Sequence, residues 1–123
     1  MNRITITSGD VSLSGELNDS PTTQQVWDAL PIAGDARMWG DEIYFEIPVN
    51  VEQEPDARAE LEVGELAYWP MGHAFCIFFG PTPVSTDERP RAYSPVNILG
   101  RVIGDAAQFR AVQDGDQVHI TKE

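Results

Sequence analysis

The chain has 123 residues, enough for one domain with a sizeable core, and its single cysteine excludes an internal disulfide bond. Twenty acidic residues against eight basic ones give a formal net charge of −12, and this field repels the phosphates of nucleic acids and anionic lipid surfaces. No apolar run approaches the roughly 20 residues that cross a bilayer, and no basic-then-apolar leader is evident. We therefore expect one cytoplasmic domain over residues 1–123 that binds neither nucleic acid nor membrane.

The chain opens with a pattern that predicts a β-hairpin. Residues 4–7 alternate apolar and polar, Ser8-Gly9-Asp10 turns the chain, and residues 11–17 alternate again. A helix of about ten residues follows, because Ser20 suits the cap position and Pro21 the first helical position. Pro31 ends it. Its one apolar side, with Val26, is typical of a helix that covers the end of a barrel.

A second hairpin is predicted over residues 36–39 and 42–47, around Gly40-Asp41. Ile43, Phe45 and Ile47 fall on one face of its second strand, and Tyr44 and Glu46 on the other. Residues 51–62 carry many carboxylates and little apolar periodicity. We expect this segment to be a solvated loop.

The central hairpin combines strands over residues 65–69 and 74–79 with a turn at Pro70-Met71-Gly72-His73. Its second strand is a continuous apolar run, so both of its faces must be covered. Alternation separates Leu66 and Tyr68 on one face from Ala67 and Trp69 on the other. After a corner at residues 80–83, a polar, proline-rich loop is expected up to Pro95.

Three further elements complete the chain: a strand over residues 96–102, one helical turn over 105–109, and a strand over 117–122. About eight short strands with one or two short helices, and a turn signal every ten residues or so, favour a mainly β fold, a closed or nearly closed barrel. A β-sandwich is the alternative.

Two stretches carry a resemblance to a known family. They are Tyr-Trp-Pro-Met-Gly-His-Ala-Phe-Cys-Ile-Phe-Phe-Gly-Pro-Thr-Pro over residues 68–83 and Ser-Pro-Val-Asn-Ile-Leu-Gly-Arg-Val over residues 94–102. Together they resemble the small prokaryotic cyclophilin-like family, and the likeness spans nearly the whole chain. The resemblance implies a closed eight-stranded cyclophilin-like barrel with short helices covering its ends.

Catalytic cyclophilins carry Phe-His-Arg, Gln-Gly-Gly-Asp and Trp-Leu-Asp-Gly-Lys-His segments, and the sequence contains none of them. In those enzymes an arginine bonded to the prolyl nitrogen lowers the roughly 20 kcal/mol barrier to rotation of the peptide bond. Where that arginine strand should run, this chain has Ile-Tyr-Phe-Glu-Ile, which brings Tyr44 or Glu46 near its place. Arg37 and Arg101 are the arginines on strands, and they are our candidates for a catalytic role. The simpler interpretation of each is a surface arginine paired with a carboxylate, with no catalytic role.

The sequence predicts a protein that binds a small molecule or short peptide in an aromatic-lined cleft, without a cofactor. The predicted ligand-binding residues are Tyr44, Glu46, Tyr68, Trp69, Phe75 and Asn97. No metal site is expected, because His73 and His119 are far apart in sequence and no cysteine pair exists. Two alternatives stay open: an atypical peptidyl-prolyl isomerase using Arg37 or Arg101, and a non-catalytic module that assembles with itself or with a partner.

Overall fold

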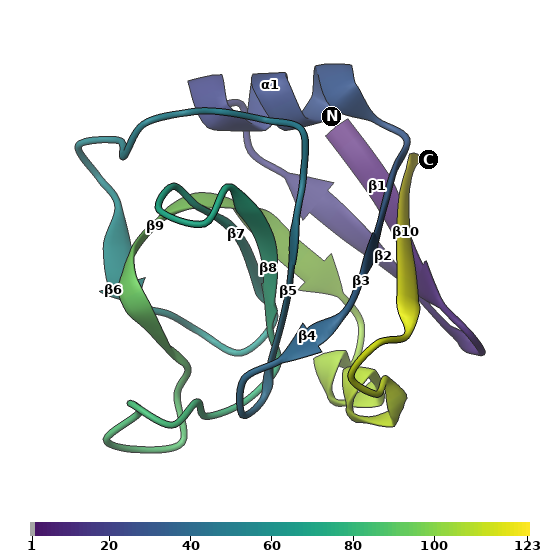
Figure 1. The fold of residues 1–123 in the computed structure, drawn as a ribbon, viewed down its shortest axis with the longest axis vertical. Coiled ribbons are helices and arrows are strands. Elements are labelled where there is room, and N and C mark those ends of the chain that lie inside the picture. The colour runs from purple at the N-terminus through teal and green to yellow at the C-terminus, as the bar shows by residue number, and fades with distance from the viewer. Residues whose placement is uncertain (1) are drawn as a thin grey trace.

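The computed structural model describes residues 2–123, most of whose regular structure is β-strand (Figure 1); Met1, the first residue of the predicted domain, lies outside the described residues. The strands are β1 (Asn2–Ser8), β2 (Val11–Leu17), β3 (Ile32–Asp35), β4 (Arg37–Met38), β5 (Glu42–Glu46), β6 (Arg58–Glu60), β7 (Glu65–Trp69), β8 (Ala74–Phe78), β9 (Arg91–Ile103) and β10 (Gln117–Lys122). The helices are α1 (Pro21–Ala29) and the 3-10 helix η1 (Ala106–Ala111). None of the helices in residues 2–123 is long and apolar enough to span a membrane.

The strands form one ten-stranded sheet in the order β3-β10-β1-β2-β9-β7-β8-β5-β4, with β6 paired to β9 off this path. Only Ala36 separates β3 from β4 in sequence, yet these strands stand at opposite ends of the order, so the sheet must roll up (Figure 1). Within residues 2–123 no ladder joins β3 to β4 or β5. The prediction of a closed eight-stranded barrel is therefore not confirmed, whereas that of a mainly β fold is.

Side-chain packing, not a hydrogen-bonded ladder, brings the two ends of the sheet together. Gly34 of β3 faces Phe45 of β5, and a Cβ atom on Gly34 would lie 2.5 Å from Phe45 Cδ2. The backbone of Ala36 is bonded instead to the turn before β10, where its N–H donates to the Asp116 carbonyl oxygen at 2.7 Å. The sequence prediction omitted β3, because Gly34 interrupts its apolar pattern.

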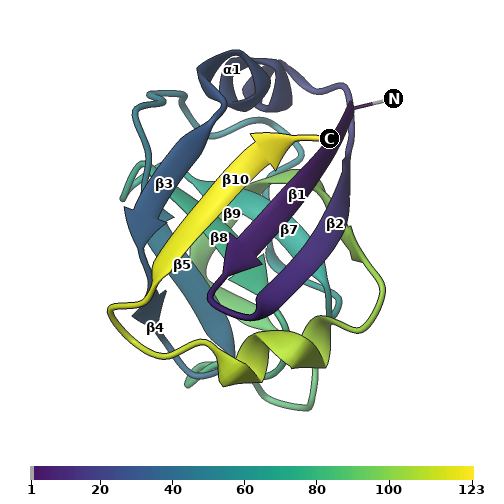
Figure 2. The ribbon, with the colours of Figure 1, turned by 90° about the vertical axis from the view of Figure 1, so that its right-hand side faces the viewer.

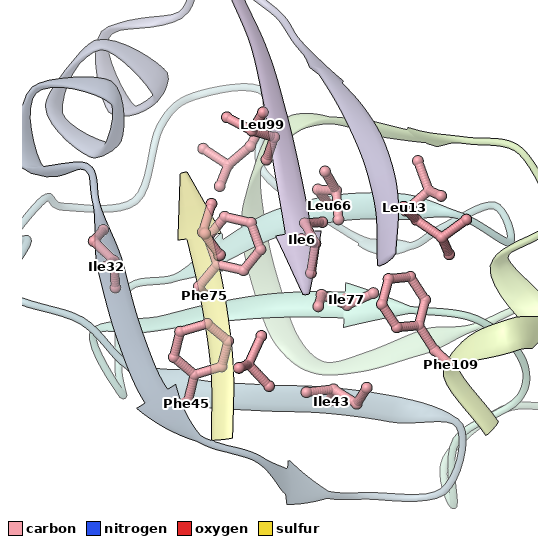
Figure 3. Close-up of a cluster of buried hydrophobic side chains, with 14 of the residues drawn as sticks. Ile6, Leu13, Ile32, Ile43, Phe45, Leu66, Phe75, Ile77, Leu99 and Phe109 are labelled. Carbon is pink, nitrogen blue, oxygen red and sulfur yellow. The ribbon is translucent and has the colours of Figure 1, made fainter. Parts of the chain in front are cut away.

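The inner face of the rolled sheet forms the main hydrophobic core (Figure 3). Ile43 and Phe45 of β5 stand opposite Ile77 and Phe75 of β8, and all four side chains are buried. Phe45 and Phe75 stack with ring centroids 5.8 Å apart. This alternation is the one predicted for β5, since every second residue of a strand points to the same face.

The two helices lie at opposite ends of the rolled sheet (Figure 2). α1 begins as predicted, with Ser20 Oγ accepting from the Thr23 N–H and Pro21 in the first helical position. At the other end η1 follows Asp105, and its Phe109 packs against Phe79 with ring centroids 6.2 Å apart. The predicted helix, the predicted helical turn and both predicted terminal strand regions are confirmed.

A second, smaller hydrophobic cluster lies on the outer face of β7 and β8, under β6 and the first half of β9. Its buried members are Leu61, Ala67, Ala74, Cys76, Phe78, Ala92 and Val96. Two predictions are wrong here. Residues 51–62 contain β6 and the buried Leu61 instead of forming only a solvated loop, and the expected polar loop stops at Arg91, where β9 begins. The first half of β9 thus covers the outer face, while its second half pairs with β7 and β2.

Candidate functional site

An aromatic cavity of about 170 Å³ opens beside this outer cluster, between β5, β7 and the first half of β9. It is lined by Trp39, Glu42, Tyr44, Trp69, Ala92, Tyr93 and Val96. Glu42 and Tyr44 reach it from alternate positions of β5, whose intervening residue Ile43 points to the core. Two strands of the rolled sheet and the covering half of β9 therefore build the aromatic cavity together.

Four aromatic rings form the walls of the aromatic cavity. Trp69 lies edge-to-face with Tyr44 at 6.3 Å and with Tyr93 at 6.2 Å between ring centroids, and Tyr93 makes a similar contact with Trp39 at 6.3 Å. The planes within these pairs meet at 86°, 78° and 74°, respectively, for Tyr44–Trp69, Trp69–Tyr93 and Trp39–Tyr93. Neighbouring rings are thus close to perpendicular, a favoured aromatic geometry, and are not stacked face to face.

Glu42 places a carboxyl group in this apolar lining. The residue is only 6% exposed, and burial raises the pKa of its carboxyl group from 4.5 to about 7, although a hydrogen bond with the Cys76 side chain opposes the shift. In residues 2–123 no arginine, lysine or histidine forms an ion pair with it. The aromatic cavity therefore contains a buried acid with no cationic partner from the described chain.

Cys76 lies behind Glu42, on β8. Its side chain is buried, and its Sγ donates weakly to the Ala74 carbonyl oxygen at 3.8 Å. Burial, together with the neighbouring Glu42, raises the pKa of the thiol well above its usual range. Since the thiolate is the reactive form, Cys76 acts here as a buried apolar residue.

The predicted ligand-binding residues Tyr44 and Trp69 line the aromatic cavity, whereas Tyr68 and Phe75 do not. Both of the latter are fully buried on the inner face of the sheet. The Tyr68 hydroxyl donates to the Val49 carbonyl oxygen at 2.7 Å and accepts from the Val51 N–H at 3.2 Å. Both side chains therefore pack in the interior, and Tyr68 also bonds to the loop after β5 that contains Val49 and Val51.

The other two predicted ligand-binding residues lie outside the aromatic cavity as well. Glu46 is exposed at the end of β5. Asn97 is fully buried, and its amide group donates to Thr22 Oγ1 and to the Glu52 carbonyl oxygen, each at 3.0 Å, while its oxygen accepts from the Glu54 N–H at 2.8 Å. Asn97 thus connects β9 to the start of α1 and to the segment after β5.

The two candidate catalytic arginines occupy different places. Arg37 is exposed on β4 directly opposite Tyr44, so it shares the outer face of the sheet without lining the aromatic cavity. No side chain among the described residues bonds to its guanidinium group. Arg101, in the second half of β9, stands opposite Glu16 of β2 and Glu65 of β7.

Arg101 lines a wider groove of about 660 Å³ at the far side of β9. Carboxylates dominate the polar side chains of this groove, and one of them, Glu65, already accepts two hydrogen bonds from Arg58 at 2.9 and 2.7 Å. Although burial raises its pKa, the bonds from Arg58 and the Glu62 N–H leave the pKa of Glu65 below its ordinary value. We take the smaller aromatic cavity as the candidate site, because its carboxyl group is buried among aromatic rings and has no cationic partner among the described residues.

Sequence reasoning missed Glu42 and Tyr93 and did not select Trp39 as a ligand-binding residue. A signal existed for Glu42, which lies two residues before Tyr44 and so on the same face of the strand. Tyr93 gave no signal, because its surroundings are rich in proline and charge and predicted a loop.

Comparison with known proteins gives a family. The family model described as Cyclophilin-like matches residues 2–121. The chain is similar to the hypothetical protein AF2241 from Archaeoglobus fulgidus, with 38% identity and a TM-score of 0.83 over 99% of this chain and 95% of that one. A search among curated proteins found no match.

A more distant structure shares the fold. McbB, solved in complex with tryptophan, is 14% identical with a TM-score of 0.68, over 98% of this chain and 44% of that one. At that identity the likeness is one of fold alone. The family match over nearly all described residues, with the close similarity to the archaeal protein, shows that this chain belongs to the cyclophilin-like family.

Proposed function

We propose that this protein binds a small organic molecule, or one side chain of a short peptide, in the aromatic cavity. The observation that carries the proposal is the lining itself: four aromatic rings and a buried carboxyl group surround about 170 Å³ of unfilled space. Binding sites for small molecules are typically such apolar concavities with a few convergent polar groups.

The exposure of its outer wall supports the same proposal. Tyr93 is 67% exposed although its ring contacts both Trp39 and Trp69. Met71 is also exposed, and its Sδ lies 3.4 Å from Ser94 Oγ, next to Tyr93 in sequence. A ligand that covers this rim removes apolar surface from water, at about 25 cal/mol for each Å².

A fragment screen by ligand-detected NMR tests the proposal. Intrinsic fluorescence follows the hits, because two of the three tryptophans, Trp39 and Trp69, line the aromatic cavity. We expect bound fragments to change this fluorescence and to raise the thermal midpoint of unfolding.

The variant Tyr93→Ala removes one wall at an exposed position and should abolish these effects without unfolding the protein. The matched control is Trp27→Phe, which changes the third tryptophan, on α1 beneath Lys122, outside the aromatic cavity. A screen without hits, or hits that bind Tyr93→Ala as tightly as the parent protein, would contradict the proposal.

A further inference from the structure

We propose that the ligand of the aromatic cavity is an organic cation with a methylated ammonium head, enclosed by the rings of Trp39, Tyr44, Trp69 and Tyr93 and paired with the Glu42 carboxylate. This inference rests on the proposed function, which it deepens by naming the ligand class. Three features of the aromatic cavity carry it: the arrangement of the rings, the unpaired acid, and the scarcity of other hydrogen-bonding groups.

The rings provide the first argument. Aromatic faces are electronegative and attract a cation that lies within about 6 Å of a ring centroid, most strongly for tryptophan. Here each neighbouring pair meets nearly at right angles, with 86° between Tyr44 and Trp69. Walls that enclose a space from several directions suit a compact, roughly spherical group better than a flat ring, which would prefer parallel surfaces.

The acid provides the second argument. A buried carboxylate is costly unless a cation or several hydrogen bonds compensate it. Among the described residues no ion pair includes Glu42, and Arg37, which has no carboxylate partner, does not line the aromatic cavity. A bound cation supplies the missing charge. The net charge of −12 also attracts cations toward the protein.

The third argument separates a methylated head from a bare ammonium group. A primary ammonium has three N–H donors, each of which needs an acceptor when it leaves water. Apart from the Glu42 carboxyl and the two tyrosine hydroxyls, the side chains that line the aromatic cavity are apolar or donors only, as Ala92, Val96 and the indoles are. Methyl groups replace those donors and contact the apolar lining, while the positive charge remains for Glu42.

The test compares two molecules of the same shape that differ in charge: choline and its neutral carbon analogue 3,3-dimethylbutan-1-ol. Each is titrated into the parent protein by calorimetry and by tryptophan fluorescence at about pH 8, where Glu42 is ionised. We expect choline to bind at least about tenfold more tightly than the analogue. Glu42→Gln keeps the size of the side chain and removes its charge, so it should weaken choline binding and cancel most of this difference.

The outcomes separate this inference from the proposed function. Equal affinities of choline and its analogue, both lost in Tyr93→Ala, would overturn the preference for a cationic ligand. The aromatic cavity would then be a binding site for neutral molecules. Choline binding that survives both Glu42→Gln and Tyr93→Ala would overturn the inference, because the cation would then lie elsewhere. Absence of choline binding also overturns it, while the fragment screen judges the proposed function independently.

A second probe distinguishes two sources of the same head group. A short peptide that carries one trimethyl-lysine is compared with choline and with the unmodified lysine peptide. Tighter binding of the trimethylated peptide than of choline points to a peptide side chain, and the reverse points to a free small molecule. Equal binding of the modified and unmodified peptides would contradict the preference for a methylated head.

Discussion

The indole nitrogen of Trp69 donates a hydrogen bond to Ser94 Oγ over 2.7 Å, which joins β7 to the first half of β9 beside the aromatic cavity. Ser94→Ala removes the acceptor, and we expect a loss of about 1 kcal/mol in the free energy of unfolding. The indole N–H resonance of Trp69 should also shift, because its partner becomes water. Urea unfolding and NMR check these two effects. Ser94→Thr, which keeps the hydroxyl group, is the control; an alanine variant with parental stability and an unchanged resonance would contradict the role of this bond.

Glu42 makes stability depend on pH in a defined direction. With a pKa of about 7 in the folded protein against 4.5 ordinarily, the folded state binds more protons than the unfolded state between these values. Stability therefore falls as pH rises through this window, by about 3 kcal/mol, and the contribution is constant above it. Glu42→Gln removes this pH-dependent contribution to the free energy of unfolding.

The difference between Glu42→Gln and the parent protein isolates Glu42 from the other carboxyl groups. We expect the variant to gain stability relative to the parent as pH rises from 4.5 to 7, in denaturant unfolding at a series of pH values. A difference that stays constant over this range would show that Glu42 is not the group responsible.

Asn97 is expected to matter for stability and not for binding. Asn97→Ala leaves the Glu54 N–H and the Glu52 carbonyl group without their partner, at a cost of about 3 kcal/mol in unfolding free energy. Fragment affinities should be unchanged where the variant is folded. Glu46→Ala, at an exposed position of β5, is the comparison and should change stability by less than about 0.5 kcal/mol. A large loss of affinity in either variant would restore these residues to the ligand-binding set.

Prolyl isomerisation is expected to be absent with a short Ala-Pro test peptide. In the described part of the chain neither Arg37 nor Arg101 lines the aromatic cavity, so neither guanidinium group is placed to bond to a proline bound there. The cis-to-trans rate is measured with and without protein at a temperature where the uncatalysed process takes minutes. Acceleration that disappears in Arg37→Ala or Arg101→Ala would instead identify an atypical isomerase.

Gly34 is expected to be required where β3 meets β5. A methyl group there would lie 2.5 Å from the ring of Phe45, which is itself buried and stacked on Phe75. We expect Gly34→Ala to cost about 2 kcal/mol through overpacking. Combining it with Phe45→Leu should recover part of that loss. Equilibrium unfolding of the parent, the two single variants and the double variant measures this coupling. Additive effects of the two substitutions would argue against this contact.

Much of the fold was predictable because it depends on local signals. The helix start at Ser20-Pro21, the hairpin turns and the alternation of β5 gave most elements close to their observed bounds. Signals failed where tertiary packing decides. β6 and the first half of β9 are polar on their exposed side, and Leu61 and Val96 alone did not reveal that these segments cover an apolar face.

The candidate site was predictable only in part. Alternation placed Tyr68 and Trp69 on opposite faces, but either face satisfies the pattern when both are covered, and only the three-dimensional arrangement shows that Trp69 lines the aromatic cavity. Tyr93 was missed because it belongs to a strand whose pairing partner, β6, is distant in sequence.

The division of β5, β7 and β8 between two hydrophobic clusters has an evolutionary consequence. Successive side chains of the same strand serve separate purposes, since Ile43 and Tyr68 fill the interior while Tyr44 and Trp69 face the outer cluster. Substitutions on the outer face can therefore accumulate with little effect on interior packing. The rolled sheet can thus stay the same while the lining of the aromatic cavity changes.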